Sequence, residues 1–338
     1  MTWKFQPALK NFEALRQRWD VINAARGGHV LLDSGFVACL LKYFGDENVM
    51  VGARDEGPAA MALLTKKSTG IWETFQPSQS PLGLILCDQT DLAGDVLTSL
   101  LRSLPGYALQ MSVMHQDPDF TSFPLLDGRA HFHRLDYIRT ARLPLEGTFE
   151  SYWTSRGTNL KHNLARRARR MVEKGITAEL IALRKSEEVA EGVREYARLE
   201  SSGWKGKSGT AVAEDNEQGK FYCEMLENFC SRREGVIYQY RLNGKVAASD
   251  LCLLRNGMLV VLKTSYDETL EEFSPALQMR RQIVQQCFAE QEVKVMEFYG
   301  PVKDWHLRWS DQVRTMYHVN CFRYPWVEKL KTAVKRVR

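Results

Sequence analysis

The part of the sequence that most limits the fold is a run of three strand-like segments followed by a marked helix start. The segments are Val236–Leu242, Val246–Leu254 and Met258–Tyr266. Ser274-Pro275 then predicts the start of a helix that runs to Ala289, because Ser is favoured at the N-cap and Pro at the first helical position. A further strand is expected at Val293–Phe298. A helix that follows a strand presents free N–H groups and the positive end of its dipole, which suits an anion such as phosphate.

Length and composition indicate an ordinary folded protein of two domains, or of one large domain with two cores. The chain has 338 residues, of which 44% are hydrophobic and 26% charged. The net charge of +5, from 46 Lys and Arg against 41 Asp and Glu, is a smaller excess than dedicated nucleic-acid binders usually carry. Positive charge therefore matters only where it is clustered.

The cysteines and the apolar segments bear on the compartment. Seven cysteines are scattered without a CxxC pair, which favours reduced thiols in a cytosol and no zinc or other metal site. The N-terminus lacks the apolar core of a signal peptide, and no apolar run approaches the roughly 18 residues that span a membrane. We expect a cytoplasmic protein. A peripheral contact with the inner membrane face stays open through the basic tail, where Trp326, Val327, Leu330, Val334 and Val337 recur at helical spacing.

Both halves of the chain read as mixed α/β. We expect one unit over residues 1–145, a second over 146–325, and a basic amphipathic tail over 326–338. The halves echo one another, since strand, strand and Ser-Pro follow Glu56-Gly57 in the first half and Asn243-Gly244 in the second. The echo is short and requires a gap, so by itself it leaves a true duplication undecided.

A basic stretch opens the second half, inside a helix expected over Thr148–Lys174. One stripe of this helix is apolar, and its other sides are basic. The stripe consists of Leu160, Leu164, Ala168, Met171 and Val172, and the basic sides carry Lys161, Arg166, Arg169 and Arg170. This pattern predicts an amphipathic helix docked on a core. Its positive surface is either solvated or gathers an anion, such as cofactor phosphates, an anionic glycan or tRNA.

The order of the elements, with several local motifs, resembles the FemAB-like or CelD-like branch of the GNAT acyltransferases, which is common in bacterial polysaccharide gene clusters. The motifs are Asn159–Arg167, Gly203-Trp204-Lys205 with Gly209-Thr210-Ala211, Tyr266-Asp267 with Phe273-Ser274-Pro275, and Asp304–Trp309. The resemblance implies an α/β (α+β) fold of two GNAT-like units in tandem, each a mixed, mostly antiparallel sheet flanked by helices. Two positions depart from the family pattern, because Ala276 replaces a Gly and Trp305-His306 replaces a Tyr-Lys pair.

The resemblance also implies where the ligands bind. The second unit would hold acyl-CoA, and the degenerate first unit would help to form the acceptor cleft. The residues expected at the donor are Lys263, Phe273, Ser274, Pro275, Ala276, Leu277 and Arg281. Those expected at the acceptor are Trp204, Lys205, Trp305, His306 and Trp309, of which the three tryptophans either wall the site or fill a core.

Amide formation from a thioester needs a proton acceptor for the attacking amine. Asp250, a carboxylate in an apolar strand, and Glu297, at the end of Val293–Phe298, are the candidate bases. Tyr266 is the candidate proton donor to the leaving thiolate. Lys263 meets a phosphate or pairs with Asp250, and His306 either titrates near neutrality or is structural.

The leading interpretation is an acyl-CoA-dependent N-acyltransferase acting on a small-molecule amine or amino sugar, a cell-envelope or exopolysaccharide precursor. One alternative is a Fem-type ligase that uses aminoacyl-tRNA, although the chain lacks the long heptad run typical of such enzymes. The other is a non-catalytic binding module. The sequence leaves the acyl chain, the acceptor and the oligomeric state open.

Overall fold

The computed structural model describes residues 3–57, 59–88, 93–120, 131–202, 212–213 and 215–327. By their contacts these residues form two compact units. Unit 1 contains the described part of 1–139 together with 314–327, and unit 2 consists of the described part of 140–313. Residues 314–325, which the sequence analysis grouped with the second half, therefore belong to the first unit.

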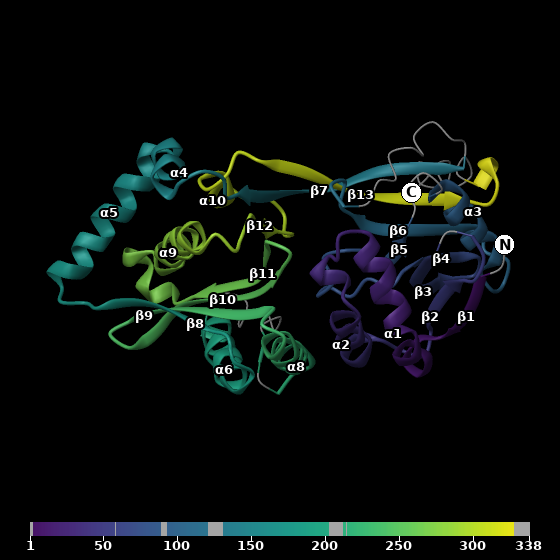
Figure 1. Cartoon of the computed structure of the whole chain (residues 1–338), viewed down its shortest axis with the longest axis horizontal. Coiled ribbons are helices and arrows are strands. Elements are labelled where there is room, and N and C mark those ends of the chain that lie inside the picture. Colours follow the sequence, from purple (N-terminus) through teal and green to yellow (C-terminus); the bar gives the residue numbers. More distant parts are fainter. Residues whose placement is uncertain are drawn as a thin grey trace, which may run out of the picture. The chain divides into compact units, whose positions relative to one another are not determined.

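Unit 1 is a mixed sheet with helices on both faces (Figure 1). Its elements are β1 (Trp3–Pro7), α1 (Ala8–Ala25), the 3-10 turn η1 (Val30–Leu32), α2 (Ser34–Phe44), β2 (Val49–Arg54), β3 (Ala60–Ser68), β4 (Ile71–Thr74), β5 (Ile85–Cys87), α3 (Ala93–Ser103), β6 (Gln110–Gln116), the first part of β7 (Phe132–Pro144), and nearly all of β13 (Val313–Phe322). The strand order β1-β2-β3-β4-β6-β13 is antiparallel except for β4 and β6, which run parallel.

Unit 2 repeats this order. Its elements are α4 (Phe149–Ser155), α5 (Thr158–Glu173), β8 (Ala178–Leu183), α6 (Ser186–Ser202), α8 (Glu217–Ser231), β9 (Gly235–Leu242), β10 (Lys245–Arg255), β11 (Met258–Tyr266), the 3-10 segment η3 (Glu268–Phe273), α9 (Pro275–Glu290), β12 (Val295–Phe298) and α10 (Asp304–Leu307). Strands β8-β9-β10-β11 are antiparallel, and β12 runs parallel to β11. Both units have the same order of elements: a strand, helices, three antiparallel strands, a helix and a parallel strand. The chain therefore consists of two GNAT-like units in tandem.

Two strands that are distant in sequence from their partners complete the sheets of the two units. Residues Ala141–Pro144 of β7, which follows β6 in sequence, pair antiparallel with β12 of unit 2. Strand β13, which follows unit 2 in sequence, pairs antiparallel with β6 of unit 1. No strand was expected at β13, because its partner β6 lies some two hundred residues earlier in the chain and leaves no local signal.

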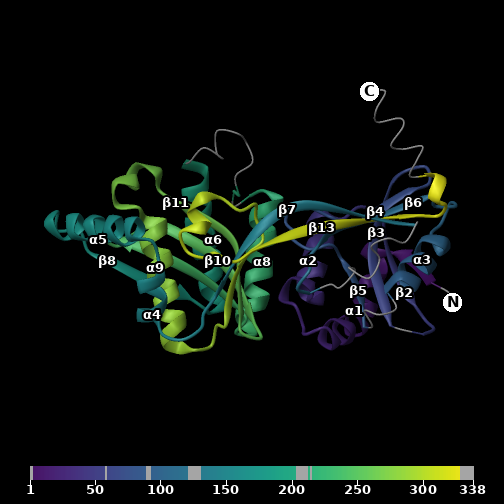
Figure 2. The same cartoon turned by 90° about the horizontal axis from the view of Figure 1, so that it is seen from above.

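Two layers of helix cover the sheet of unit 2. Helices α4, α5 and α9 lie on one face, and α6 and α8 on the other (Figures 1 and 2). The α9 face is an apolar core that includes Ala248, Cys252, Met279 and Ile283. Successive strand residues point to opposite faces, so the neighbouring positions of β10 and β11 belong to the α6 and α8 side.

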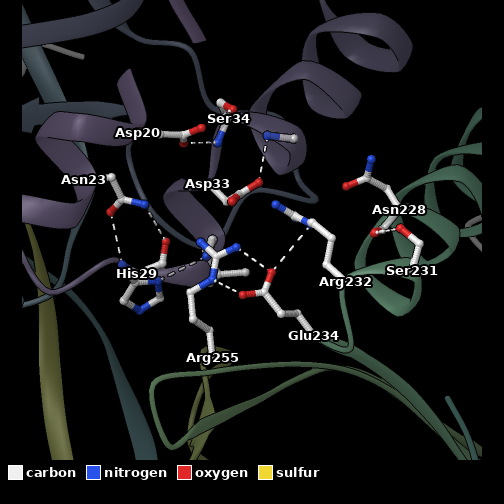
Figure 3. Close-up of polar contacts among 12 residues, drawn as sticks. Asp20, Asn23, His29, Asp33, Ser34, Asn228, Ser231, Arg232, Glu234 and Arg255 are labelled. Atoms are coloured by element: carbon white, nitrogen blue, oxygen red, sulfur yellow. Dashed lines mark hydrogen bonds and ion pairs between the residues drawn. The ribbon is translucent and has the colours of Figure 1, made fainter. Parts of the chain in front are cut away.

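Short polar contacts fix the loops within each unit, and Figure 3 shows two of them. In unit 1, Asn23 donates from Nδ2 to the His29 carbonyl at 3.0 Å and accepts the His29 N–H at 3.0 Å. In unit 2, Arg255 donates two hydrogen bonds of 2.6 Å to the Glu234 carboxylate at the end of the β9–β10–β11 meander. The turns of this meander, at Asn243-Gly244 and Asn256-Gly257, have positive φ angles, which Asn and Gly tolerate.

The expected helix over Thr148–Lys174 is broken into α4 and α5 at Arg156–Gly157. Helix α5 is amphipathic as predicted, with Leu160, Leu164 and Met171 buried. Val172, which we placed on the apolar stripe, is instead 77% exposed.

Candidate active site

The backbone of unit 2 opens between its two parallel strands. Strands β11 and β12 are paired over Met258–Val260 and Val295–Glu297. Strand β11 then continues to Tyr266, still paired with β10. Its register with β10 shifts at Leu262, which is a β-bulge of the kind that often borders active sites. Within the described chain, the edge of β11 from Val261 to Tyr266 thus has no strand partner on the β12 side, and we call this opening the β11–β12 gap.

Helix α9 begins after this gap, at Pro275, as the sequence predicted. Ser274 adopts the left-handed conformation, with φ 49° and ψ 58°, and its side chain makes no capping hydrogen bond. The N–H groups of Leu277 and Gln278 both donate to the Ser274 carbonyl, at 3.1 and 3.0 Å. Because Pro275 has no N–H, the first turn of α9 offers an anion only the Ala276 N–H.

The basic helix α5 covers the beginning of α9. The buried Gln278 amide donates to the Leu164 carbonyl at 2.9 Å, and Arg167 donates to the Glu271 carbonyl at 2.8 Å. Lys174 pairs with Glu272 at 3.0 Å. Part of the positive charge of α5 is therefore neutralised by η3, while Arg166 and Arg169 stay exposed to solvent.

The α9 face of the gap contains a buried ion pair. Asp250 is fully buried, and its Oδ2 lies 2.7 Å from Nη2 of Arg280, which is itself 2% exposed. Thr264 donates to the other carboxylate oxygen at 2.6 Å. Burial raises the pKa of Asp250, and the charge of Arg280 opposes that shift. Of the two alternatives considered for Lys263, the pairing with Asp250 is not formed, because Lys263 lies on the opposite face of the sheet.

The opposite face contains a second buried polar cluster, formed by Glu200, Lys263, Tyr196 and Tyr222. Nζ of Lys263 lies 3.8 Å from Oε1 of Glu200 and 5.7 Å from the centre of the Tyr222 ring. Tyr196 donates to Oε1 of Glu200 at 3.0 Å, and the Val212 N–H donates to Oε2 at 2.7 Å. Burial, reinforced by Glu200, raises the pKa of both tyrosines. This cluster lies directly beside the bulge at Leu262.

Glu297 shares that face of the sheet. Its neighbours Met296 and Phe298 pack in the α9 core, so the side chain of Glu297 points to the α6 and α8 side. It is 2% exposed, pairs with Arg142 at 3.4 Å, and lies level with Val260, where the β11–β12 gap begins. Tyr266, at the other end of the gap, is 40% exposed, and burial with Glu268 and Glu271 raises its pKa.

The other predicted donor residues surround the start of α9. Phe273 and Pro275 are buried, and Ala276 and Leu277 are partly buried against the core. The Arg281 guanidinium lies 5.3 Å from the centre of the Trp153 ring, and its buried Nε has no hydrogen-bond partner. The structure therefore brings Arg281 to α4 on the same face as α5.

The structure places the predicted acceptor residues in different surroundings. Trp309 is fully buried against Leu160 and Leu164, so it fills a core instead of walling a site. His306 accepts the Lys303 N–H at 2.9 Å and stacks on Trp305 with ring centres 3.6 Å apart. Burial, with the charge of Arg280, lowers the pKa of His306 to about 4, which favours the structural one of the two alternatives considered for this residue. Trp204 and Lys205 lie outside the described residues.

The equivalent gap in unit 1 is filled by the chain itself. Strands β4 and β6 are also paired over three residues each, and beyond them β5 pairs with Ala60–Ala62 of β3. Gly83, just before β5, donates to the carbonyl of His115, near the end of β6, at 3.1 Å. A Cβ atom on Gly83 would lie 2.0 Å from the Met114 carbonyl oxygen, so this segment is packed directly on β6.

Comparison with known proteins agrees with this geometry. Residues 158–306 match the family model of the acetyltransferase (GNAT) domain. The matched part of unit 2, which is similar to a GNAT acetyltransferase domain, includes the β11–β12 gap, the start of α9 and both buried polar clusters. The search of curated proteins finds no match to this chain.

Solved structures extend the fold similarity over both units. The chain resembles FemX with 10% identity and a TM-score of 0.61, covering 93% of this chain and 97% of that one. It resembles L-PGS from Bacillus licheniformis with 12% identity and a TM-score of 0.52, covering 91% of each chain. It also resembles the C-terminal domain of a putative lysylphosphatidylglycerol synthetase from Agrobacterium fabrum, with 12% identity and a TM-score of 0.53, covering 94% of this chain and 92% of that one. At these identities the similarity establishes the GNAT fold alone.

Glu200, and the pairing of Arg280 with Asp250, were not predicted from the sequence. Glu200 follows Val189, Val193 and Tyr196 on the buried face of α6, and Arg280 follows Gln278 and Met279 on the buried face of α9. A charged residue on the apolar stripe of a helix was the signal that could have identified both.

Proposed function

We propose that unit 2 is an N-acyltransferase that moves an acyl group from acyl-CoA to the amino group of a small-molecule acceptor. The observation that carries the proposal is the β11–β12 gap, which lies between a helix start and a buried cluster of Glu200 and Lys263. The acceptor class, an amine or amino sugar of a cell-envelope or exopolysaccharide precursor, comes from the sequence resemblance.

The residues around the gap fit such a donor. An extended strand edge can pair with the amide groups of a pantetheine chain in the manner of an added strand. The Ala276 N–H and the dipole of α9 favour phosphate oxygens beyond Tyr266, with Phe273, Ser274, Pro275, Leu277 and Arg281 around them. Acyl-CoA would supply an acyl group activated as a thioester. We place acyl-CoA in unit 2 because in unit 1 the segment that leads into β5 fills the equivalent gap.

We assign the proton acceptor for the amine to Glu297 in preference to Asp250. Glu297 lies where the gap begins and on the same face as Lys263. Asp250 lies on the other face and is held by Arg280 and Thr264, so its role is to position the strands of the gap. Lys263 would place positive charge near the developing oxyanion. Tyr266 lies six residues along β11 from Val260, at the opposite end of the gap from Glu297, so we do not assign it to the same reacting centre.

A second candidate is a ligase that takes its acyl group from aminoacyl-tRNA. It is favoured by the fold similarity to FemX and by the exposed Arg166 and Arg169 of α5. Such an enzyme should bind tRNA with an affinity that falls steeply with salt. A non-catalytic module would bind neither donor productively.

Thermal unfolding of the full chain with and without CoA and acetyl-CoA tests the proposal. A ligand at about 100 times its dissociation constant adds roughly 2.7 kcal/mol to the folded state, which raises the midpoint by several degrees. An unchanged midpoint with both compounds, together with salt-sensitive tRNA binding, would replace the proposal by the ligase. With a donor bound, turnover should fall in Glu297→Gln. Full turnover in that variant contradicts the assignment of the base.

A further inference from the structure

Unit 1 contains a cluster of two histidines and a tyrosine that the proposed activity does not use. His115 lies near the end of β6, His318 on β13 and Tyr137 on β7. The Tyr137 ring stacks on that of His115 with centres 4.3 Å apart, and its centre lies 4.5 Å from that of His318. The two imidazole centres are 5.2 Å apart. Beside this cluster lie residues 76–83, which lead into β5 and which we call the filling loop.

His115 holds the filling loop on β6. Its carbonyl accepts the Gly83 N–H at 3.1 Å. Its Nδ1 lies 3.0 Å from Nε2 of Gln76, and the same amide donates to the carbonyls of Ser80 at 2.5 Å and Leu82 at 3.4 Å. Because these two carbonyls can only accept, the group of Gln76 that faces them is the NH₂, which is also a donor toward Nδ1. His115 therefore holds the loop with an imidazole that is unprotonated at Nδ1.

His318 holds His115 in turn. The backbone N–H of His115 donates to Nδ1 of His318 at 2.9 Å. A backbone N–H can only donate, so His318 must also be unprotonated at Nδ1. The φ angle of His115 is 43°, in the left-handed region that a residue with a Cβ atom rarely adopts. Such a conformation persists only where the surrounding contacts maintain it, and the bond to His318 is one of those contacts.

The surroundings keep both imidazoles neutral. Burial lowers the pKa of His115 from 6.5 to about 4, the charge of His318 adds to the shift, and the carbonyls of Pro81 and Ser80 oppose it. Burial also lowers the pKa of His318, against the charge of Glu73. A neutral imidazole whose Nδ1 accepts a hydrogen bond carries its proton on Nε2, so a second proton can go only to Nδ1.

The carboxylates nearest to the cluster have cations of their own. Glu73, on β4, pairs with Lys67 at 3.0 Å. Asp117, which follows β6, pairs with Arg314 of β13 at 2.7 Å. Among the described residues, both acids are therefore already engaged when a proton reaches an imidazole of the cluster.

We propose that His115 and His318 form an acid-sensitive latch, which releases the filling loop from β6 when they are protonated. A proton on Nδ1 of His318 would face the backbone N–H of His115, and a proton on Nδ1 of His115 would face the Gln76 amide. In each case two opposed donors replace a hydrogen bond. Release would uncover the part of β6 that the loop covers in unit 1. The latch does not depend on the proposed acyl transfer.

Hydrogen exchange of the full chain, followed by mass spectrometry, tests the latch. Peptides that cover the filling loop are compared at about pH 7 and about pH 5, with rates corrected for the intrinsic effect of pH. A histidine whose pKa is lower in the closed state than in the open state stabilises the closed state above the open-state pKa, and this stability is lost as pH falls. With pKa values of 6.5 open and about 4 closed, His115 alone should raise the opening constant about twentyfold. Peptides from β9 of unit 2 should keep their protection.

A double variant separates the latch from a general effect of acid. Asn places an oxygen near the position of Nδ1, does not titrate and tolerates a positive φ angle. His115→Asn with His318→Asn should therefore hold the loop at about pH 7 and remove the rise in exchange at about pH 5. His162→Asn, at an exposed histidine of α5, is the matched control and should open as the wild type does. Equal exchange of the wild-type loop at both pH values, or an undiminished rise in the double variant, would overturn the proposal.

Discussion

At the scale of single residues, Arg280 and Asp250 bury opposite charges in the core of unit 2. Removing one partner of such a pair leaves a charge that cannot be solvated, which typically costs about 3–5 kcal/mol. Arg280→Met should therefore destabilise unit 2 by about that amount. Urea unfolding of the variant and of the wild type measures the difference.

The loss of folding stability in Arg280→Met should also depend on pH. Burial already raises the pKa of Asp250 above the 3.8 of an unperturbed Asp, and loss of the guanidinium raises it further. A carboxyl group whose folded-state pKa is raised contributes stability at low pH and loses it as pH rises. The variant should lose less stability at about pH 5 than at about pH 8. Arg281→Met, whose guanidinium faces Trp153, is the matched control, and an equal loss at both pH values would contradict a role in charge compensation.

Lys263 and Glu200 give a prediction about turnover. If the Lys263 ammonium stabilises the oxyanion, Lys263→Met should lower turnover about a hundredfold or more. Glu200→Gln should also lower turnover, because it leaves Lys263 without its partner charge, and the double variant should be little worse than Lys263→Met. Steady-state kinetics measures both effects. Lys220→Met, at a lysine on the surface of α8 that pairs with Glu217, should be neutral. Additive losses in the double variant would show that the two residues act separately.

At the scale of elements, the second half of the fold could be predicted from the sequence better than the first. The strand expected at Met258–Tyr266 is β11, and the helix expected at Ser274–Ala289 is α9, displaced by one residue. Both have strong local signals, namely turns with Asn-Gly and a Ser-Pro start. Strand β13 and the filling of unit 1 by β5 depend on pairing with distant strands, which local patterns do not contain.

The candidate site could be predicted only in part, for the same reason. One stretch of sequence contains the start of α9 and the residues Lys263, Tyr266 and Glu297, and all of them lie along the β11–β12 gap or at its ends. Their partners come from distant segments: Glu200 lies on α6, and Arg142 of β7 pairs with Glu297. For His306 the sequence left two alternatives open, because the burial that lowers its pKa has no local signal in the sequence.

The start of α9 gives a prediction about donor binding. Ala276→Pro removes the last free N–H of the first turn, where Pro is tolerated. Loss of one hydrogen bond to a charged group costs about 1.5–3 kcal/mol, so the dissociation constant for acetyl-CoA should rise about tenfold or more. Ala276→Gly, which keeps the N–H, is the matched control and should bind at least as well as the wild type. Titration calorimetry compares the three proteins, and equal affinities would place the phosphates elsewhere.

At the scale of the whole molecule, the two units share an order of elements but differ where the donor would bind. In unit 1 the segment from Gly83 to Cys87 bridges β6 and β3, and Leu84, Ile85 and Leu86 are at most 2% exposed. In unit 2 the described residues place no strand between β11 and β12 beyond Val260. Within the described residues, the opening is therefore present in unit 2 and filled in unit 1.

This difference predicts that one chain binds one acyl-CoA. Titration calorimetry of the full chain with acetyl-CoA should give a stoichiometry of about one, because in the described part of unit 1 the segment from Gly83 to Cys87 lies between β3 and β6, in place of the opening. In Ala276→Pro the same single site should weaken, which would assign it to unit 2. Two equivalent sites would show that the segment before β5 moves out of unit 1 when the donor binds. The close approach of Gly83 to Met114 argues against that movement, since leaving would break the packing of three buried apolar side chains.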